Sequence, residues 1–122
     1  MGPKGGFRFG VEIERKDSQG VEQMKVFCYD LVLTVLWAEK LVHPGFLVHD
    51  STLFADVDER QKARAIELAA RESQEKGFQY IVCLNSDSLP TEDFSKDFKI
   101  DDYVRLRLSD ASADTGLLGI RF

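Results

Sequence analysis

Hydrophobic and polar residues follow a pattern along the chain that predicts strand, helix, strand, helix and strand in that order. From residue 7 to 14 apolar positions alternate with charged ones, which is the period of a half-buried strand. Between Val21 and about Lys40 apolar residues recur at helical spacing with further apolar residues between them, so we expect a helix buried on most sides. Two short apolar runs then predict buried strands, Phe46 to Val48 and Gln79 to Leu84.

Capping residues mark the second helix. Asp58 stands where an N-cap would accept amide hydrogen bonds ahead of a helix over Glu59 to Lys76, and Gly77 is suited to the C′ position. Because strands and helices alternate, we expect an α/β fold with a mainly parallel sheet core and flanking helices. A closing antiparallel strand pair is expected over Tyr103 to Leu108 and Leu117 to Phe122.

Composition narrows the class of protein. With 122 residues and 43% hydrophobic content, we expect one α/β domain over residues 7–122 after a flexible lead-in at residues 1–6. A net charge of -5 argues against a broad phosphate-binding surface, so any DNA contact would be local or lie outside this chain. Cys28 and Cys83 lie in apolar surroundings, which favours reduced, buried thiols and a cytoplasmic location. The apolar stretch from Val26 to Ala38 is too short for a bilayer, so no membrane partner is expected.

The end of the Phe46 to Val48 strand carries the first candidate chemistry. The apolar run stops abruptly at Asp50, which places a carboxylate at the edge where open α/β sheets bind ligands. If the sheet is parallel, the polar turn from Asn85 to Asp87 shares this edge. Asp50 would then be an oxygen ligand to Mg²⁺, directly or through water. The alternative is a buried strand that ends in a turn, with Asp50 as its cap.

The start of the long helix and the histidine before Asp50 each have a functional and a structural interpretation. Ser18 and Gly20 precede the long helix, whose free amides and positive dipole end suit phosphate binding, but they also fit an ordinary serine N-cap with a turn glycine. His49 adjoins Asp50 and could reach a phosphate. However, strand alternation points its side chain away from that of Asp50, which favours a core or interface role.

Three segments together resemble known ATPase motifs. Asp17 to Met24 resembles a degenerate ABC-type signature motif, Asp50 to Asp58 resembles a Walker B strand with its D-loop, and Tyr80 to Asp87 resembles the switch strand. Their order resembles the C-terminal lobe of an SMC-like, coiled-coil ATPase head. More closely, Phe-Leu-Val-His-Asp-Ser, Val-Asp-Glu-Arg-Gln and Gly-Leu-Leu-Gly-Ile-Arg-Phe resemble an uncharacterised bacterial domain family found at the C-terminus of such ATPases, over residues 7 to 122.

The resemblance implies a role for each motif in an ATP sandwich between two heads. Ser18 and Gly20 would contact the γ-phosphate bound by the opposing head, and Asp50 would hold magnesium. Asp58, with Asp56 as the other choice, would be the D-loop aspartate at the dimer interface. Asn85 would occupy the switch position.

Two residues depart from the ABC-type pattern. Ser51 stands where a glutamate usually orients the attacking water, and it cannot act as a carboxylate base. Asn85 replaces the usual switch histidine and cannot titrate near neutrality. Hydrolysis would then be slow, or would use Asp56, Asp58, Glu59 or His49 instead.

The chain contains no Gly-Lys dipeptide, and therefore no Walker A loop. We therefore expect no autonomous ATPase but a lobe that needs a Walker A lobe in cis or in trans. The expected cofactors, ATP and Mg²⁺, would bind only in the complete head. That head would form a homodimer with a second ATPase head. Any contact with DNA would be made by the full-length protein. Two alternatives remain: a pseudo-ATPase interaction module without turnover, and a freestanding α/β domain that binds a small molecule.

Overall fold

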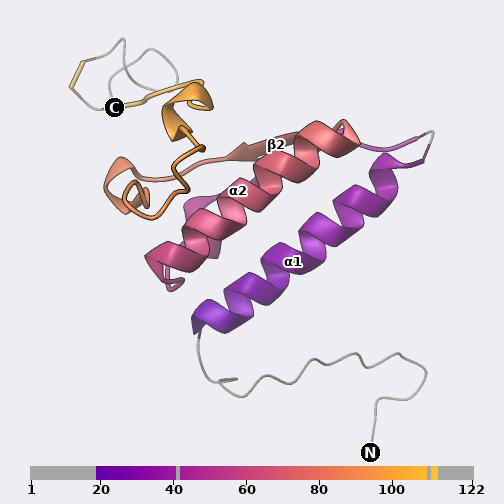
Figure 1. The fold of residues 1–122 in the computed structure, drawn as a ribbon, viewed down its shortest axis with the longest axis horizontal. Helices are drawn as coiled ribbons and strands as arrows, with labels where there is room; N and C mark the ends of the chain where they lie inside the picture. The colour runs from indigo at the N-terminus through magenta and orange to yellow at the C-terminus, as the bar shows by residue number, and fades with distance from the viewer. Residues whose placement is uncertain (1–18, 41, 110, 113–122) are drawn as a thin grey trace, which may run out of the picture.

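The computed structural model describes residues 19–40, 42–109 and 111–112, which form a mixed helix and strand fold (Figure 1). Helix α1 spans Gln19–Ala38, strand β1 spans Phe46–His49, helix α2 spans Glu59–Lys76 and strand β2 spans Gln79–Val82. Three short 3-10 turns complete the elements: η1 (Ser51–Phe54), η2 (Ser86–Ser88) and η3 (Ile100–Asp102). The two helices and the two apolar strands therefore form where the sequence predicts them.

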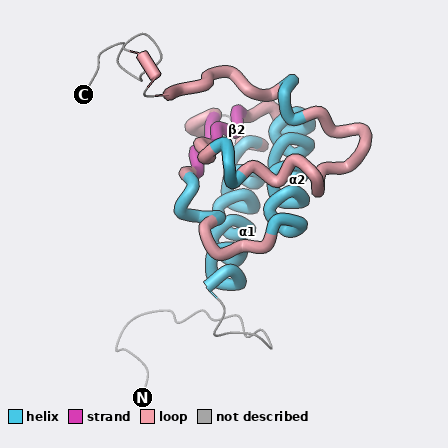
Figure 2. Tube along the Cα trace, turned by 90° about the vertical axis from the view of Figure 1, so that its left-hand side faces the viewer, coloured by secondary structure: helices cyan, strands magenta, loops and turns pink. Residues whose placement is uncertain are grey.

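The two strands form a parallel pair, as expected from the helix that connects them. Phe46 lies opposite Gln79 and His49 lies opposite Val82. Figures 1 and 2 show α1 and α2 side by side, and the contacts place α1 against β1 and α2 against β2. Both helices therefore pack on the sheet, and the carboxyl ends of both strands meet at one edge.

Local capping explains the bounds of α2. The Asp58 carboxylate accepts a hydrogen bond from the Gln61 amide at 2.9 Å, which satisfies one of the unpaired amides of the first turn. Gly77 ends the helix in the left-handed region with φ 76°, and its amide donates to the Ser73 carbonyl at 3.0 Å. Asp58 is thus the N-cap and Gly77 the terminating glycine, as the sequence predicts.

The core lies between the helices and the inner face of the sheet. Phe27 from α1 and Phe54 from η1 are its largest fully buried side chains, with ring centroids 6.0 Å apart. Ala65 and Ala69 of α2 are buried beside them, because small side chains let this helix approach closely.

A buried histidine joins the three elements around this core. The His49 side chain is 6% exposed, and its Nε2 atom lies 2.8 Å from Asp30 Oδ2 of α1. Its Nδ1 atom lies 2.9 Å from Tyr80 Oη of β2. Since a carboxylate accepts, Nε2–H donates to Asp30, and Nδ1 accepts from the Tyr80 hydroxyl. Strand alternation therefore sends His49 into the core and leaves Asp50 exposed, as expected.

The expectation that α1 is buried on most sides is wrong. Its buried residues are Gly20, Phe27 and Leu31, and six other large side chains are 37–62% exposed: Val26, Tyr29, Val32, Leu33, Leu36 and Trp37. Among the described residues, packing against α1 comes from one side only, so its opposite face has no cover. The expectation that the two thiols are buried is also wrong, since Cys28 and Cys83 are both exposed, although both are free as expected.

The expected strand over Tyr103 to Leu108 is not formed. Tyr103 closes the turn η3, and residues 104–109 have no regular structure. A strand needs a partner for its backbone groups, and none of the described residues pairs with this segment. The other expected strands, at 7–14 and 117–122, and the lead-in at 1–6 lie outside the described residues. Within the described part of the chain, none of the helices has the length and hydropathy needed to span a membrane.

The buried Tyr80 predicts a loss of stability at high pH. Burial, and then the negative charge of Asp30, raise the pKa of the Tyr80 phenol above its usual value. Above about pH 10 the unfolded chain loses this proton while the folded chain keeps it, so the free energy of unfolding should fall by up to about 1.4 kcal/mol per pH unit. Urea unfolding between about pH 8 and pH 11 measures this slope, which Tyr80→Phe should reduce.

The control is Tyr103→Phe, which removes an exposed hydroxyl and should keep the slope of the unaltered chain. At about pH 8, Tyr80→Phe should also cost about 1 kcal/mol, because His49 Nδ1 loses its donor. Equal slopes for Tyr80→Phe and the unaltered chain would show that the Tyr80 hydroxyl does not cause the loss of stability at high pH.

Candidate functional site

The candidate site lies at the carboxyl edge of the parallel pair. Asp50 follows β1 and Asn85 lies just beyond β2, so the two predicted polar turns share this edge. The Cys83 amide donates to the His49 carbonyl at 3.1 Å, which continues the pairing up to the first turn. The pairing of the strands therefore brings the two segments to the same edge.

Asp50 caps the turn η1 and is also an exposed carboxylate. Its Oδ1 atom accepts from the Thr52 amide at 3.0 Å and from the Thr52 hydroxyl. The hydroxyl, and then the amide, lower the pKa of the Asp50 carboxyl, which favours the ionised form. Among the described residues Oδ2 has no hydrogen-bond partner. The capping role is therefore present, and one carboxylate oxygen remains open to a ligand.

Gly20 lies in the first turn of α1 and is buried against the loop after η1. A Cβ atom there would overlap the Asp56 carbonyl oxygen and lie 3.2 Å from the carbonyl carbon. The glycine thus permits close contact between α1 and the segment that resembles a D-loop. Ser18, the other residue expected to bind phosphate, lies outside the described residues.

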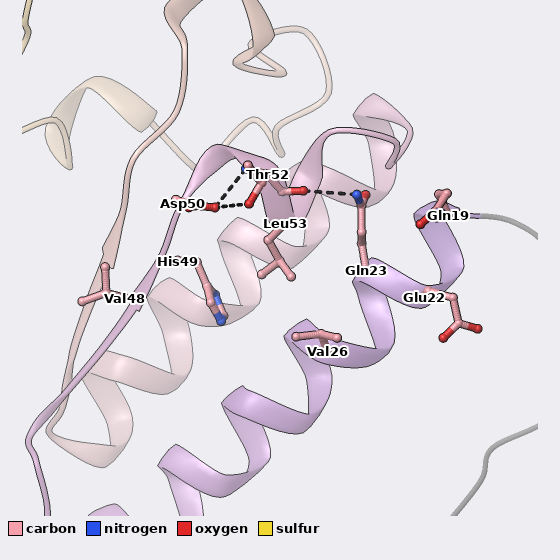
Figure 3. A pocket seen from close by; sticks show the side chains of 9 residues that line it. All are labelled: Gln19, Glu22, Gln23, Val26, Val48, His49, Asp50, Thr52 and Leu53. Atoms are coloured by element: carbon pink, nitrogen blue, oxygen red, sulfur yellow. Dashed lines mark hydrogen bonds between the residues drawn. The ribbon is translucent and has the colours of Figure 1, made fainter.

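Gln23 fixes the same contact, although none of the sequence motifs assigns it a role. Its Nε2 atom donates to the Thr52 carbonyl at 3.1 Å (Figure 3). The same atom donates to Asp56 Oδ2 at 3.3 Å, and Oε1 accepts from the Asp56 amide at 3.0 Å. Gln23 follows Gly20 by three residues, which puts both on one side of the helix. That spacing is the only signal in the sequence that could have identified it.

An open groove of about 580 Å³ separates the start of α1 from the turn after β1 (Figure 3). Helix α1 forms one wall, and the end of β1 with the turn after it forms the other. The lining residues are Gln19, Glu22, Gln23 and Val26 on the first wall, and Val48, His49, Asp50, Thr52 and Leu53 on the second. The lining contains two carboxylates and no lysine or arginine. An anionic ligand in this groove would therefore need cations from elsewhere, either a metal ion or another protein segment.

The remaining predicted site residues lie around this edge. Ser51 directly follows Asp50 and is half-buried, while the Asp58 carboxylate is engaged as the cap of α2. Asn85 is exposed, and its carbonyl oxygen accepts from the Ser88 amide and hydroxyl, each at 3.0 Å. The Asn85 side chain makes no capping bond, so it remains available.

A buried lysine supports the turn that contains Asn85. Lys62 is 4% exposed, and its Nζ atom donates to Glu59 Oε1 at 2.9 Å and to the Ser88 carbonyl at 3.0 Å. These bonds tie the first turn of α2 to η2. Helical periodicity gave no indication of this role, since a lysine among polar neighbours normally faces solvent.

The residues present suit only part of a magnesium site. Asp50 offers one open carboxylate oxygen, and Mg²⁺ is commonly held by one or two carboxylates with waters and substrate phosphates. Within the described residues there is no group of three side chains that could hold a metal ion by themselves. Any metal at Asp50 would therefore need ligands from a nucleotide or a second protein segment.

Fold and site define a small α/β domain with an acidic turn at the carboxyl edge of a parallel strand pair. The profile of one domain family, described as "Uncharacterised protein conserved in bacteria (DUF2326)", matches residues 2–122. The chain therefore belongs to this family. No match was found among curated proteins. None was found among solved structures either.

The close contact at Gly20 leads to a stability prediction. Gly20→Ala should lower the free energy of unfolding by about 1–3 kcal/mol, because the new methyl group forces α1 away from the Asp56 carbonyl. Chemical denaturation measures this change. Gln19→Ala is the matched control, since it introduces alanine at the exposed neighbouring position. Its free energy of unfolding should stay within about 0.5 kcal/mol of that of the unaltered chain. Equal stabilities of the two variants would show that the contact is not tight.

Proposed function

We propose that this chain is the C-terminal lobe of an SMC-like, ABC-type ATPase head. In this proposal it supplies the signature, Walker B, D-loop and switch elements to ATP-dependent dimerisation of two heads. A Walker A lobe, in cis or in trans, completes each head, and the chain alone does not turn over ATP. Asp50 holds Mg²⁺, and Ser18 and Gly20 face the γ-phosphate bound by the opposing head.

The observation that carries the proposal is the incomplete sheet. Among the described residues each strand pairs along one edge only, and the apolar side chains of the outer face are 38–53% exposed: Phe46, Val48 and Ile81. Parallel sheets are normally covered on both faces, and two strands alone are marginally stable. A second lobe that adds strands and a covering layer would satisfy both needs.

The charge of the groove supports the same proposal. Asp50 and Glu22 line it without any basic residue, and Lys25 next to it is already paired with Glu22 at 3.0 Å, so the lining offers a triphosphate no cation. A Walker A lobe supplies a lysine and a loop of backbone amides, and Mg²⁺ supplies two further positive charges. The acidic edge is thus suited to one half of a composite site.

The other proposed roles follow the positions of the residues. Asp58, or Asp56, is the D-loop aspartate, and Asn85 is the switch residue that hydrogen-bonds a phosphate oxygen. Gly20 has its Cα against Asp56, so its role toward phosphate is confined to the backbone amides of the first turn of α1. Ser51 stands at the position of the usual general base and does not replace it.

The second candidate function is a pseudo-ATPase interaction module without turnover. Three residues favour it. Ser51 and Asn85 each lack a group that titrates near neutrality. The Asp58 carboxylate is already engaged as a helix cap. Such a module would keep the fold and bind partners. It differs from the first candidate in one measurable property, which is hydrolysis by the complete head.

Hydrolysis by the complete head tests the role of Asp50. Asp50→Asn keeps an oxygen that can accept from Thr52 but removes the negative charge, so ATP turnover should fall about a hundredfold. Asp97→Ala is the control, because it removes an exposed carboxylate outside the groove and should leave turnover unchanged. Unchanged turnover in Asp50→Asn would refute the Walker B assignment, and a head that dimerises without any turnover would favour the pseudo-ATPase.

Binding by the chain alone gives a separate test. Titration calorimetry of this chain with ATP and Mg²⁺ should show negligible heat, because the groove offers no cation to the phosphates. The same titration of the complete head is the positive control. Tight binding by this chain alone would contradict the split-head proposal and support a freestanding domain that binds a small molecule.

A further inference from the structure

The outer face of α1 carries an apolar stripe with the spacing of a helix-pairing seam. Val26, Tyr29, Leu33 and Leu36 follow one another at intervals of three, four and three residues, as a and d positions do in paired helices. Val32 and Trp37 flank this stripe. All six side chains are 37–62% exposed.

The stripe is separate from the face that already packs in the fold. With 100° per residue, its centre lies on the side of α1 opposite the buried Phe27 and Leu31. It is also distinct from the open sheet face, which Phe46, Val48 and Ile81 form. Six large apolar side chains exposed together on one helix face indicate an interaction site for another apolar surface.

Charges at the two ends of the stripe indicate its occupant. Glu22 lies in the first turn of α1, where its Oε1 atom also pairs with Lys25 Nζ at 3.0 Å, and Lys40 lies in the turn that follows the helix. With 100° per residue Glu22 lies in line with the stripe, and Lys40 lies two residues beyond the last helical residue, Ala38. The stripe thus begins with an exposed acidic residue and ends with an exposed basic one.

We propose that the outer face of α1 binds α1 of a second copy of this chain, antiparallel and about a two-fold axis. Tyr29 then lies opposite the partner's Leu33, and Val26 lies opposite the partner's Leu36. The same alignment brings Glu22 to the partner's Lys40. The proposal goes beyond the composite ATPase site and does not depend on it. Glu22 and Val26 also line the groove, but the contact between the helices requires neither nucleotide nor a residue of the carboxyl edge.

Physical reasons favour a second copy in this orientation. A two-fold axis uses the same patch on both copies, and this stripe is complementary to itself when reversed. Antiparallel alignment places opposite charges at both ends and opposes the two helix dipoles. Parallel alignment would instead put glutamate against glutamate and lysine against lysine.

Sedimentation velocity of the chain without nucleotide, over a series of concentrations, tests the proposal. The fraction of dimer should rise with concentration, and Tyr29→Glu should abolish it because it places two charges near the axis. Phe46→Glu is the matched control, since Phe46 is similarly exposed on the sheet face and the variant should dimerise normally. Circular dichroism of both variants verifies that they fold.

A charge exchange tests the antiparallel alignment. Glu22→Lys and Lys40→Glu should each weaken the dimer about tenfold, since each change affects two symmetry-related pairs. The double variant should restore the original dissociation constant. A chain that is monomeric at all concentrations, a dimer unaffected by Tyr29→Glu, or a double variant that remains weak would each overturn the proposal.

Discussion

The rest of the structure depends on the buried imidazole of His49. Its two nitrogens bond to Asp30 of α1 and Tyr80 of β2, so one side chain of β1 holds three elements together. A buried polar group stabilises a fold only when its hydrogen bonds are satisfied, and both nitrogens have partners here. Because successive residues of a strand point to opposite sides, fixing His49 inward also fixes Asp50 outward at the carboxyl edge.

The loops at this edge are held by the helices rather than by each other. Gln23 and Gly20 join α1 to the segment around Asp56, and Lys62 joins α2 to the turn after β2. The positions of both turns therefore follow the packing of the helices. This arrangement couples any displacement of α1 to the segment that resembles a D-loop, through the hydrogen bonds of Gln23 to Thr52 and Asp56.

The fold leaves two apolar surfaces uncovered among the described residues, and they differ in geometry. One is the outer face of a two-stranded parallel sheet, which lacks both a covering layer and neighbouring strands. The other is the outer stripe of α1, which has helix-pairing spacing and opposite charges at its ends. The first suits a second lobe of the same sheet, and the second suits another helix.

The sequence by itself determined the elements whose signals are local. Caps defined α2 between Asp58 and Gly77, short apolar runs located β1 and β2, and the connecting helix implied that they pair in parallel. The exposed carboxylate of Asp50 followed from the abrupt end of its apolar run. These features depend on neighbouring residues, so a linear pattern is enough to predict them.

Only the tertiary structure decided which apolar surfaces are buried and which polar atoms meet. Helix α1 is apolar almost all round, so its sequence does not say which side faces the core, and the expected burial of Cys28 was wrong for that reason. The strand expected over Tyr103 to Leu108 likewise depends on a partner far along the chain. The hydrogen bonds that His49, Gln23 and Lys62 make to other elements join residues 19 to 33 positions apart. Such distances carry no periodic signal, because they are set by how the layers pack and not by the backbone geometry of any one element.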